Sequence, residues 1–301
     1  MRQRCSYLPP RFLLIIFILI QQSSFAVEGP YEHSIETAHL RILWNTADAS
    51  ATEVRRFKVE AETIYKSVMN TLGEKRAPVE KITIILDGSA KLPGKPPRTP
   101  FTEPSRGWVH LFRYTSSDYA YHNGLSHELT HAYRFEEIKK HDKDKSTGFG
   151  FVEEGLAEYV SVLVEPNKPF FSTYGMPLNV IASYWMSEEK AIPLLKLLNQ
   201  YSELDQKCLV QAYPLRASFI QYLDITFGRA ALLGFAFSRE AVNLALFKHL
   251  FGKEFLDLER DWKAYLIKST AMISDLPAMR EHYRNAYIQK SMYICTSGKD
   301  F

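Results

Sequence analysis

Residues 126–133 read Ser-His-Glu-Leu-Thr-His-Ala-Tyr, and the pattern His-Glu-x-x-His within them decides how the rest of the chain is interpreted. Residues four apart lie on one face of a helix, about 6 Å apart along its axis, so the imidazoles of His127 and His131 can converge on one metal ion. Glu128 lies one position on, beside such an ion, where it can take a proton from water as a general base. By itself the motif is also compatible with a surface helix that carries two solvated histidines.

A second acidic segment contains candidates for the third protein ligand that a catalytic zinc site needs. Residues 151–159 read FVEEGLAEY and are predicted to form a helix. Glu154 and Glu158 are four residues apart and share a face of that helix. One of them can bind the metal, while the other accepts the spare ring N–H of a ligand histidine.

The run Glu154-Gly155-Leu156-Ala157-Glu158-Tyr159 resembles the Glu-Gly-x-Ala segment that follows His-Glu-x-x-His in gluzincin metallopeptidases. These include the aminopeptidase N type enzymes and the smaller peptidase MA-like proteins. The resemblance implies one Zn²⁺ per chain, held by His127, His131 and Glu154, with Glu158 supporting a ligand histidine. The competing assignment makes Glu153 the ligand and leaves Ala157 at the supporting position.

A further resemblance covers residues 213–223, YPLRASFIQYL, which are similar to the aminopeptidase-type helix that begins with a tyrosine. In the family this tyrosine hydrogen-bonds the oxyanion of the tetrahedral intermediate, which implies that role for Tyr213. Arg216 stands where the family often has glycine, and the other interpretation is that Tyr213 merely begins a helix. The Gly-x-Met-Glu-Asn motif, which grips the free amine of aminopeptidase substrates, is absent, so a strict aminopeptidase is not predicted.

Apolar periodicity predicts an α+β fold of the zincin type, with a small N-terminal sheet, one packed helix and a mainly helical C-terminal half. Strands are expected at 37–44, 81–87 and 108–114, and a proline-rich loop at 90–105. Helices are expected at 50–72, 123–139, 151–164, 179–186, 193–200, 210–227, 229–237, 239–251 and 253–267. Residues 27–36 and the tail from Ile273 are expected to be less regular. Residues 107–110 are either an edge strand that pairs with an extended peptide or an ordinary strand of the sheet.

The first 26 residues are typical of a secretory signal peptide. A basic segment up to Arg11 precedes nine apolar residues at 12–20 and the small-residue site Ser24-Phe25-Ala26. Because a membrane span needs about 20 apolar residues, cleavage after Ala26 is predicted rather than anchoring, which leaves no stable membrane span. The predicted organisation is a signal peptide at 1–26, an α+β subdomain at 27–118, a helical metallopeptidase subdomain with the zinc site at 119–270 and a tail at 271–301.

Charge argues against a nucleic-acid partner. Three of the 37 Lys and Arg residues lie in the leader, which leaves 34 against 34 acidic residues and no basic stripe. Export permits a disulfide between Cys208 and Cys295, although two separate buried thiols fit equally well. The sequence therefore predicts an exported, periplasmic or secreted, zinc metallopeptidase that acts on a peptide or protein. The alternative is a catalytically silent zinc-binding protein on the same scaffold, and the oligomeric state is not predicted.

Overall fold

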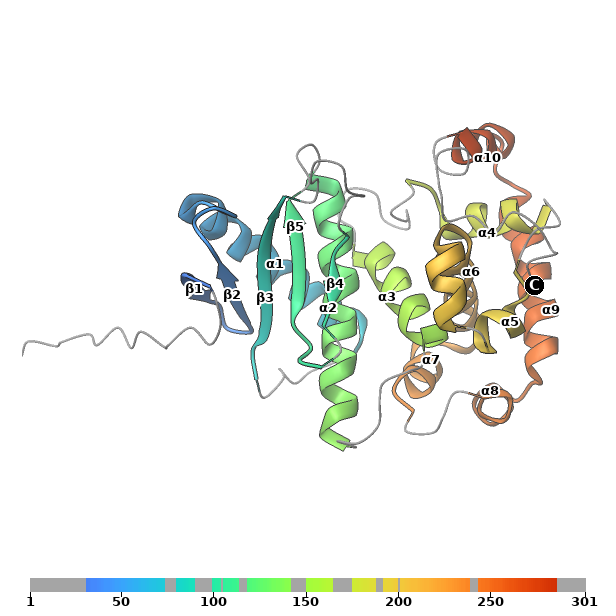
Figure 1. Ribbon diagram of the computed structural model, residues 1–301. Coiled ribbons are helices and arrows are strands. Elements are labelled where there is room, and N and C mark those ends of the chain that lie inside the picture. The colour runs from blue at the N-terminus through green and yellow to red at the C-terminus, as the bar shows by residue number, and fades with distance from the viewer. Residues whose placement is uncertain are drawn as a thin grey trace, which may run out of the picture.

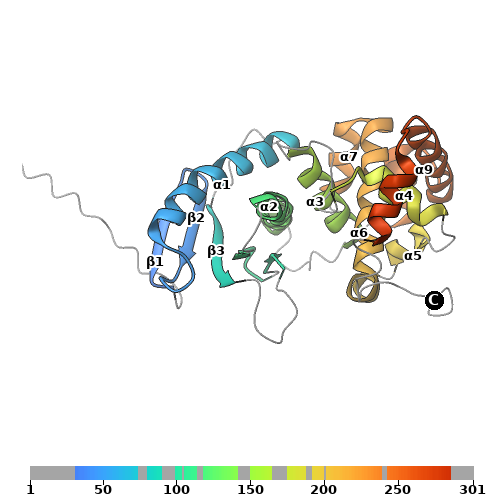
Figure 2. The same cartoon turned by 90° about the horizontal axis from the view of Figure 1, so that it is seen from above.

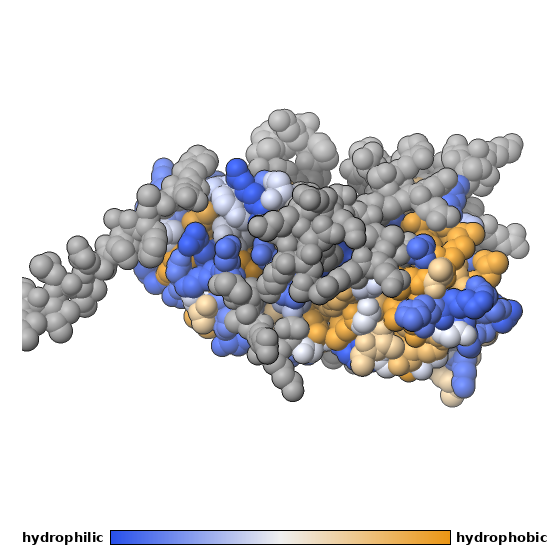
Figure 3. Space-filling view, turned by 90° about the horizontal axis from the view of Figure 1, so that it is seen from below, coloured by the Kyte–Doolittle hydropathy of each residue, from blue (hydrophilic) through white to orange (hydrophobic). Residues whose placement is uncertain are grey.

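A five-stranded sheet lies at the N-terminal end and a group of helices at the C-terminal end, with helices α2 (Asp118–His141) and α3 (Gly150–Val164) between them (Figure 1). The computed structural model describes residues 31–73, 80–89, 99–103, 105–113, 118–141, 150–164, 175–187, 192–199, 201–238 and 243–285. The fold is α+β, as expected. Figure 3 shows that, on the face drawn there, apolar residues gather over the helical half.

The sheet has the order β1-β2-β3-β5-β4. Its strands are β1 (His33–Glu36), β2 (Leu40–Trp44), β3 (Ile82–Ser89), β4 (Phe101–Thr102) and β5 (Val109–Arg113). Strands β2, β3 and β5 run parallel, while β1 and β4 pair antiparallel at the two edges. Parallel pairing of β2 and β3 requires a crossover connection, and helix α1 (Ala51–Thr71) supplies it.

Helix α1 begins and ends where its sequence dictates. The Ser50 side chain accepts a hydrogen bond from the backbone N–H of Glu53, and the Glu53 side chain accepts one from the backbone N–H of Ser50, which completes a capping box. Gly73 adopts a φ of 70° just past the last turn. Together with helix α2 (Asp118–His141), α1 covers one side of the sheet (Figures 1 and 2). The helix that carries the His-Glu-x-x-His pattern is therefore packed against the sheet.

The remaining helices form the C-terminal half. They are α3 (Gly150–Val164), α4 (Leu178–Ser187), α5 (Leu194–Asn199), α6 (Tyr201–Phe227), α7 (Arg229–Ala236), α8 (Leu244–Phe251), α9 (Phe255–Thr270) and α10 (Leu276–Tyr283). Their core is rich in aromatic rings around Phe219, which is fully buried. The Phe219 ring centroid lies 5.9 Å from those of Phe151, Phe255 and Trp262. These spacings suit edge-to-face packing, which ties α3, α6 and α9 together.

Helices α3 and α6 cross closely at Gly155. A Cβ atom at this position would lie 3.0 Å from Cγ1 of Ile220 and 3.1 Å from Cβ of Arg216, both on α6. It would also lie 3.3 Å from the backbone carbonyl carbon of Arg216, which cannot rotate away as a side chain can. The glycine therefore sets how near the two helices approach.

Most of the expected elements are present, but three further elements form where none was expected, and one segment is an interior strand rather than an edge strand. Strand β1 forms within 27–36, because its residues pair with β2 from His33↔Trp44 to Glu36↔Arg41. Strand β4 forms within the proline-rich stretch, and α10 forms in the tail. Residues 109–110 belong to β5, which is paired on both sides, so the edge-strand interpretation of 107–110 is wrong.

The expectations for the leader, the cysteines and a membrane span are tested only in part. The leader at 1–26 and its cleavage site lie outside the described residues, as do Cys5 and Cys295. Cys208 is fully buried and is disulfide-bonded. Within the described part of the chain, no helix combines the length and apolar character needed to cross a membrane.

Gly155→Ala should destabilise the protein although alanine is the better helix former. We expect a loss of about 1–3 kcal/mol in the free energy of unfolding, because the added methyl forces α3 and α6 apart. Gly234→Ala in α7 is the matched control, since a Cβ there meets nothing within 4 Å. It should be neutral or gain up to about 1 kcal/mol. Urea unfolding of both variants measures the difference, and equal stabilities would show that the crossing tolerates a side chain.

Candidate metal centre

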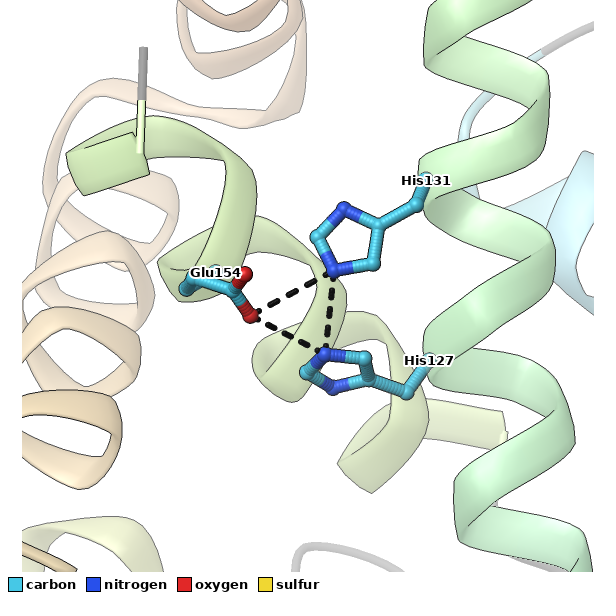
Figure 4. Close-up of side chains that lie close together, drawn as sticks. All are labelled: His127, His131 and Glu154. Atoms are coloured by element: carbon cyan, nitrogen blue, oxygen red, sulfur yellow. Dashed lines mark hydrogen bonds and ion pairs between the residues drawn. The ribbon is translucent and has the colours of Figure 1, made fainter. Parts of the chain in front are cut away.

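Two neighbouring helices bring three metal-ligating side chains together, as Figure 4 shows. His127 and His131 extend from one face of α2, and Glu154 extends toward them from α3. The Nε2 atoms of the two histidines are 3.1 Å apart. Oε2 of Glu154 lies 3.1 Å from Nε2 of His127 and 3.3 Å from Nε2 of His131.

This triangle fits a zinc ion. In a tetrahedral site with bonds of about 2.0–2.1 Å, neighbouring ligand atoms are about 3.3–3.4 Å apart. The three sides of the triangle are 3.1, 3.1 and 3.3 Å, so the atoms lie close to the positions of one face of such a tetrahedron. Two imidazole nitrogens and one carboxylate oxygen are also the donor types of a catalytic zinc site, which keeps its fourth position open. Within the described residues this is the one group of three such side chains.

The charges of the cluster depend on one another. Burial works to lower the pKa of His127, but hydrogen bonds with Glu154 and Glu158 outweigh it and raise that pKa well above its ordinary value. Burial also works to lower the pKa of His131, but the charge of Glu154, its hydrogen bond to the ring and the charge of Glu128 together raise that pKa. For Glu154, burial works to raise the pKa, but His131 and His127 hold it well below its usual range. The cluster therefore keeps an ionised carboxylate beside imidazoles that attract protons.

The neighbouring acids of α3 differ in their partners. Oε2 of Glu158 lies 3.5 Å from Nδ1 of His127, at the ring nitrogen that does not face Glu154. Glu153 contacts α2 at a different residue, because its carboxylate accepts a hydrogen bond from Nη1 of the buried Arg134. Nε of Arg134 donates to the carbonyl of Ala236 at 3.0 Å. Glu154 thus lies with the histidines, Glu158 lies behind one of them, and Glu153 belongs to a separate ion pair.

Glu128 is 6% exposed and lies on a different face of α2 from the two histidines. Its Oε2 atom accepts a hydrogen bond from Oγ1 of Thr102, on strand β4, at 2.8 Å. No recognisable signal in the sequence marks Thr102, which lies in a proline-rich stretch 26 residues from Glu128. Arg134 was missed for a similar reason, since an arginine in a polar helix is normally exposed.

Tyr213 also lies beside the cluster. Its ring is stacked on that of His127, with centroids 6.1 Å apart and an interplanar angle of 11°. The residue belongs to α6, where the backbone is kinked at Cys208 and where Pro214 lies inside the helix. The helix expected at 210–227 follows the non-helical backbone of Cys208, while a separate helical segment that begins at Tyr201 precedes this kink.

Pro214 leaves the carbonyl of Val210 without its usual helical donor, because proline has no N–H. The hydroxyl of Tyr283, on α10, donates to this carbonyl at 3.0 Å, and Nε1 of Trp185 donates to the same hydroxyl oxygen at 3.2 Å. Tyr283 is fully buried. The helical turn that carries Tyr213 is therefore held by α4 and α10, and the tail of the chain has a structural role.

Comparison with known proteins finds a likeness among solved structures. No protein-family model matches the chain, and no curated protein does. Among solved structures, the chain is similar to an M1 zinc metallopeptidase mutant from Deinococcus radiodurans, bound to a Tyr-Ser-Ala substrate. The two are 15% identical, with a TM-score of 0.41, and the match covers 78% of this chain and 51% of that one. The chain spans about half the length of that structure.

Zinc affinity should depend steeply on pH. Only a neutral imidazole binds a metal, so protons compete with zinc up to the pKa of each ligand histidine. Because the pKa values of His127 and His131 are raised, this competition should extend above the ordinary histidine range of about 6.5. We expect the apparent affinity to rise from pH 6 to pH 8, as measured by competition with a chromogenic chelator. An affinity that is constant over this range would contradict the ligand assignment.

Glu158→Ala should weaken zinc binding by about 10–100-fold, because His127 loses the carboxylate that faces its Nδ1. Glu259→Ala is the control, since Glu259 is also buried on a helix but pairs with Lys263 far from the site. The same chelator competition measures both variants. If the two substitutions changed the affinity equally, Glu158 would have no specific part in zinc binding.

Proposed function

We propose that the protein is a zinc-dependent metallopeptidase of the gluzincin type. The observation that carries the proposal is the triangle of ligand atoms from His127, His131 and Glu154, which matches one face of a tetrahedral zinc site. The carboxylate of Glu128 directly follows His127 on the same helix. A purely structural zinc site is normally closed by four protein ligands. Three ligands beside an acidic residue that is not one of them are instead typical of a hydrolytic site.

Zinc, when bound, would polarise the scissile carbonyl and make water a better nucleophile. Neutral His127 and His131 would hold it through Nε2, and Glu154 would hold it through a carboxylate oxygen. Glu158 would accept the Nδ1–H of His127 and so keep that ring in the tautomer whose Nε2 lone pair faces the metal. These four side chains bind and orient, and none of them needs to gain or lose a proton during turnover.

Glu128 would move the proton. As the oxygen of water bonds to the carbonyl carbon, the Glu128 carboxylate takes the proton that water loses. When the C–N bond breaks, Glu128 returns this proton to the leaving nitrogen, and both products are released. Tyr213, stacked on His127, would donate a hydrogen bond to the carbonyl oxygen as negative charge develops on it.

The same proposal includes export and a peptide or protein substrate. The leader sequence supports export, and so does the disulfide at Cys208, because such bonds persist in oxidising compartments. A near-neutral mature chain argues against nucleic acid as a partner.

Glu128→Gln should abolish turnover and leave zinc binding nearly unchanged. Glutamine keeps the size of the side chain but cannot accept the proton, so we expect kcat to fall by at least about 100-fold. Glu137→Gln, on the same helix beyond the metal ligands, is the control and should keep wild-type activity. Zinc content by mass spectrometry and cleavage of a quenched fluorescent peptide library measure the two properties on the mature chain from Val27.

Three results would separate the alternatives. One zinc per chain in both proteins, with cleavage only in the wild type, would support a metallopeptidase. One zinc in both with no cleavage in either would favour a catalytically silent zinc-binding protein. Peptidase activity that survives in Glu128→Gln would refute the assignment of the base.

A further inference from the structure

Strand β4 lies along one face of α2. A Cβ atom at Gly124 would be 3.0 Å from Cγ of Pro100, which directly precedes β4. Farther along, Thr102 bonds to Glu128, and a Cβ atom at Gly107 would be 2.8 Å from Cδ1 of Phe135. Gly124, Glu128 and Phe135 are separated by four and seven residues, so they share a face of the helix. The β4–β5 hairpin therefore packs on the face of α2 that carries the proposed base.

The hydroxyl of Thr102 has two acceptors on Glu128. Oγ1 of Thr102 lies 2.8 Å from the carboxylate Oε2 and 3.0 Å from the backbone carbonyl oxygen of the same residue. A hydroxyl carries one proton, and a hydrogen bond to an ionised carboxylate is stronger than one to a neutral carbonyl. Because Glu128 is buried, the loss of this donor would not be fully replaced by bulk water.

The position of Thr102 is fixed by pairing on β5. Phe101 is opposite His110 and Thr102 is opposite Val109 in the antiparallel ladder. Successive side chains of a strand point to opposite faces, so Phe101 lies on the face away from α2. There its ring stacks on that of His110, with centroids 4.5 Å apart and planes 3° apart. A backbone bond from N–H of Glu103 to the carbonyl of Trp108, at 2.8 Å, extends this pairing.

We propose that Thr102 is a positioning residue for Glu128, a statement that rests on the proposed peptidase function. By holding Oε2, its hydroxyl limits rotation of the carboxylate, so that Oε1 is the oxygen that exchanges the proton with water. The edge strand of the sheet thus orients the base, while α3 completes the metal site on another face of the same helix.

Thr102→Val removes the hydroxyl and keeps the branched shape, which suits a strand. We expect kcat to fall by about 10–100-fold, the range for a lost hydrogen bond to a charged group, with a smaller change in KM and unchanged zinc content. Thr102→Ser should restore most of kcat, because it keeps the hydroxyl. Thr83→Val, at a buried threonine on strand β3 of the same sheet, is the matched control and should have wild-type kcat.

Two outcomes would overturn the proposal: a wild-type kcat in Thr102→Val, or a loss in Thr102→Ser as large as that in Thr102→Val. High-resolution crystal structures of the same variants test the positioning role of Thr102 independently of any activity measurement. The Glu128 carboxylate should keep one orientation in the wild type and in Thr102→Ser, and should rotate or become disordered in Thr102→Val. An unmoved carboxylate would reject the positioning role, whereas an inactive wild type would reject only the proposed peptidase function.

Discussion

The position of α3 is the constraint on which the rest of the structure depends. This helix is buried along most of its length, between α2 on one side and α6 on the other, and it still carries three acidic residues. A buried charge is tolerated only when it is paired. Glu153 pairs with Arg134, Glu154 contacts both histidines and Glu158 faces His127. On the opposite side Gly155 allows α6 to approach closely enough to place Tyr213 beside His127.

Helix α2 separates the parts of the site by its geometry alone. Residues 127 and 131 share a face and meet α3, whereas residue 128 is rotated by about 100° and meets β4. A third set, Leu125, Leu129 and Ala132, is fully buried and packs into the core. One helix thus holds the metal ligands, the base and the hydrophobic contact with the sheet. A different neighbouring element packs against each of these faces.

Much of the fold follows from local patterns. The long helix α1, the strands β2, β3 and β5, and the helices of the C-terminal half have apolar periodicity over enough residues to be recognised. The elements that were missed are short or depend on partners far away. Strand β4 contains only Phe101 and Thr102 and exists because β5 offers an edge to pair with. Helix α10 is anchored by Tyr283, which bonds a carbonyl exposed by Pro214, 69 residues earlier in the chain.

The sequence by itself determined how the two histidines and the glutamate of α2 lie relative to one another, because their relative positions depend only on the 3.6-residue turn of a helix. It also pointed to the acidic run of α3, but its residues alone left open whether Glu154 or Glu158 binds the metal, and Glu153 competed with Glu154 for that role. Tertiary structure decided between them in space, since Glu153 lies with Arg134 and Glu154 lies with His127 and His131. The contact of Thr102 with Glu128 was decided only there as well. Such choices depend on the approach of elements far apart in the chain, and no local pattern of residues encodes the distance between them.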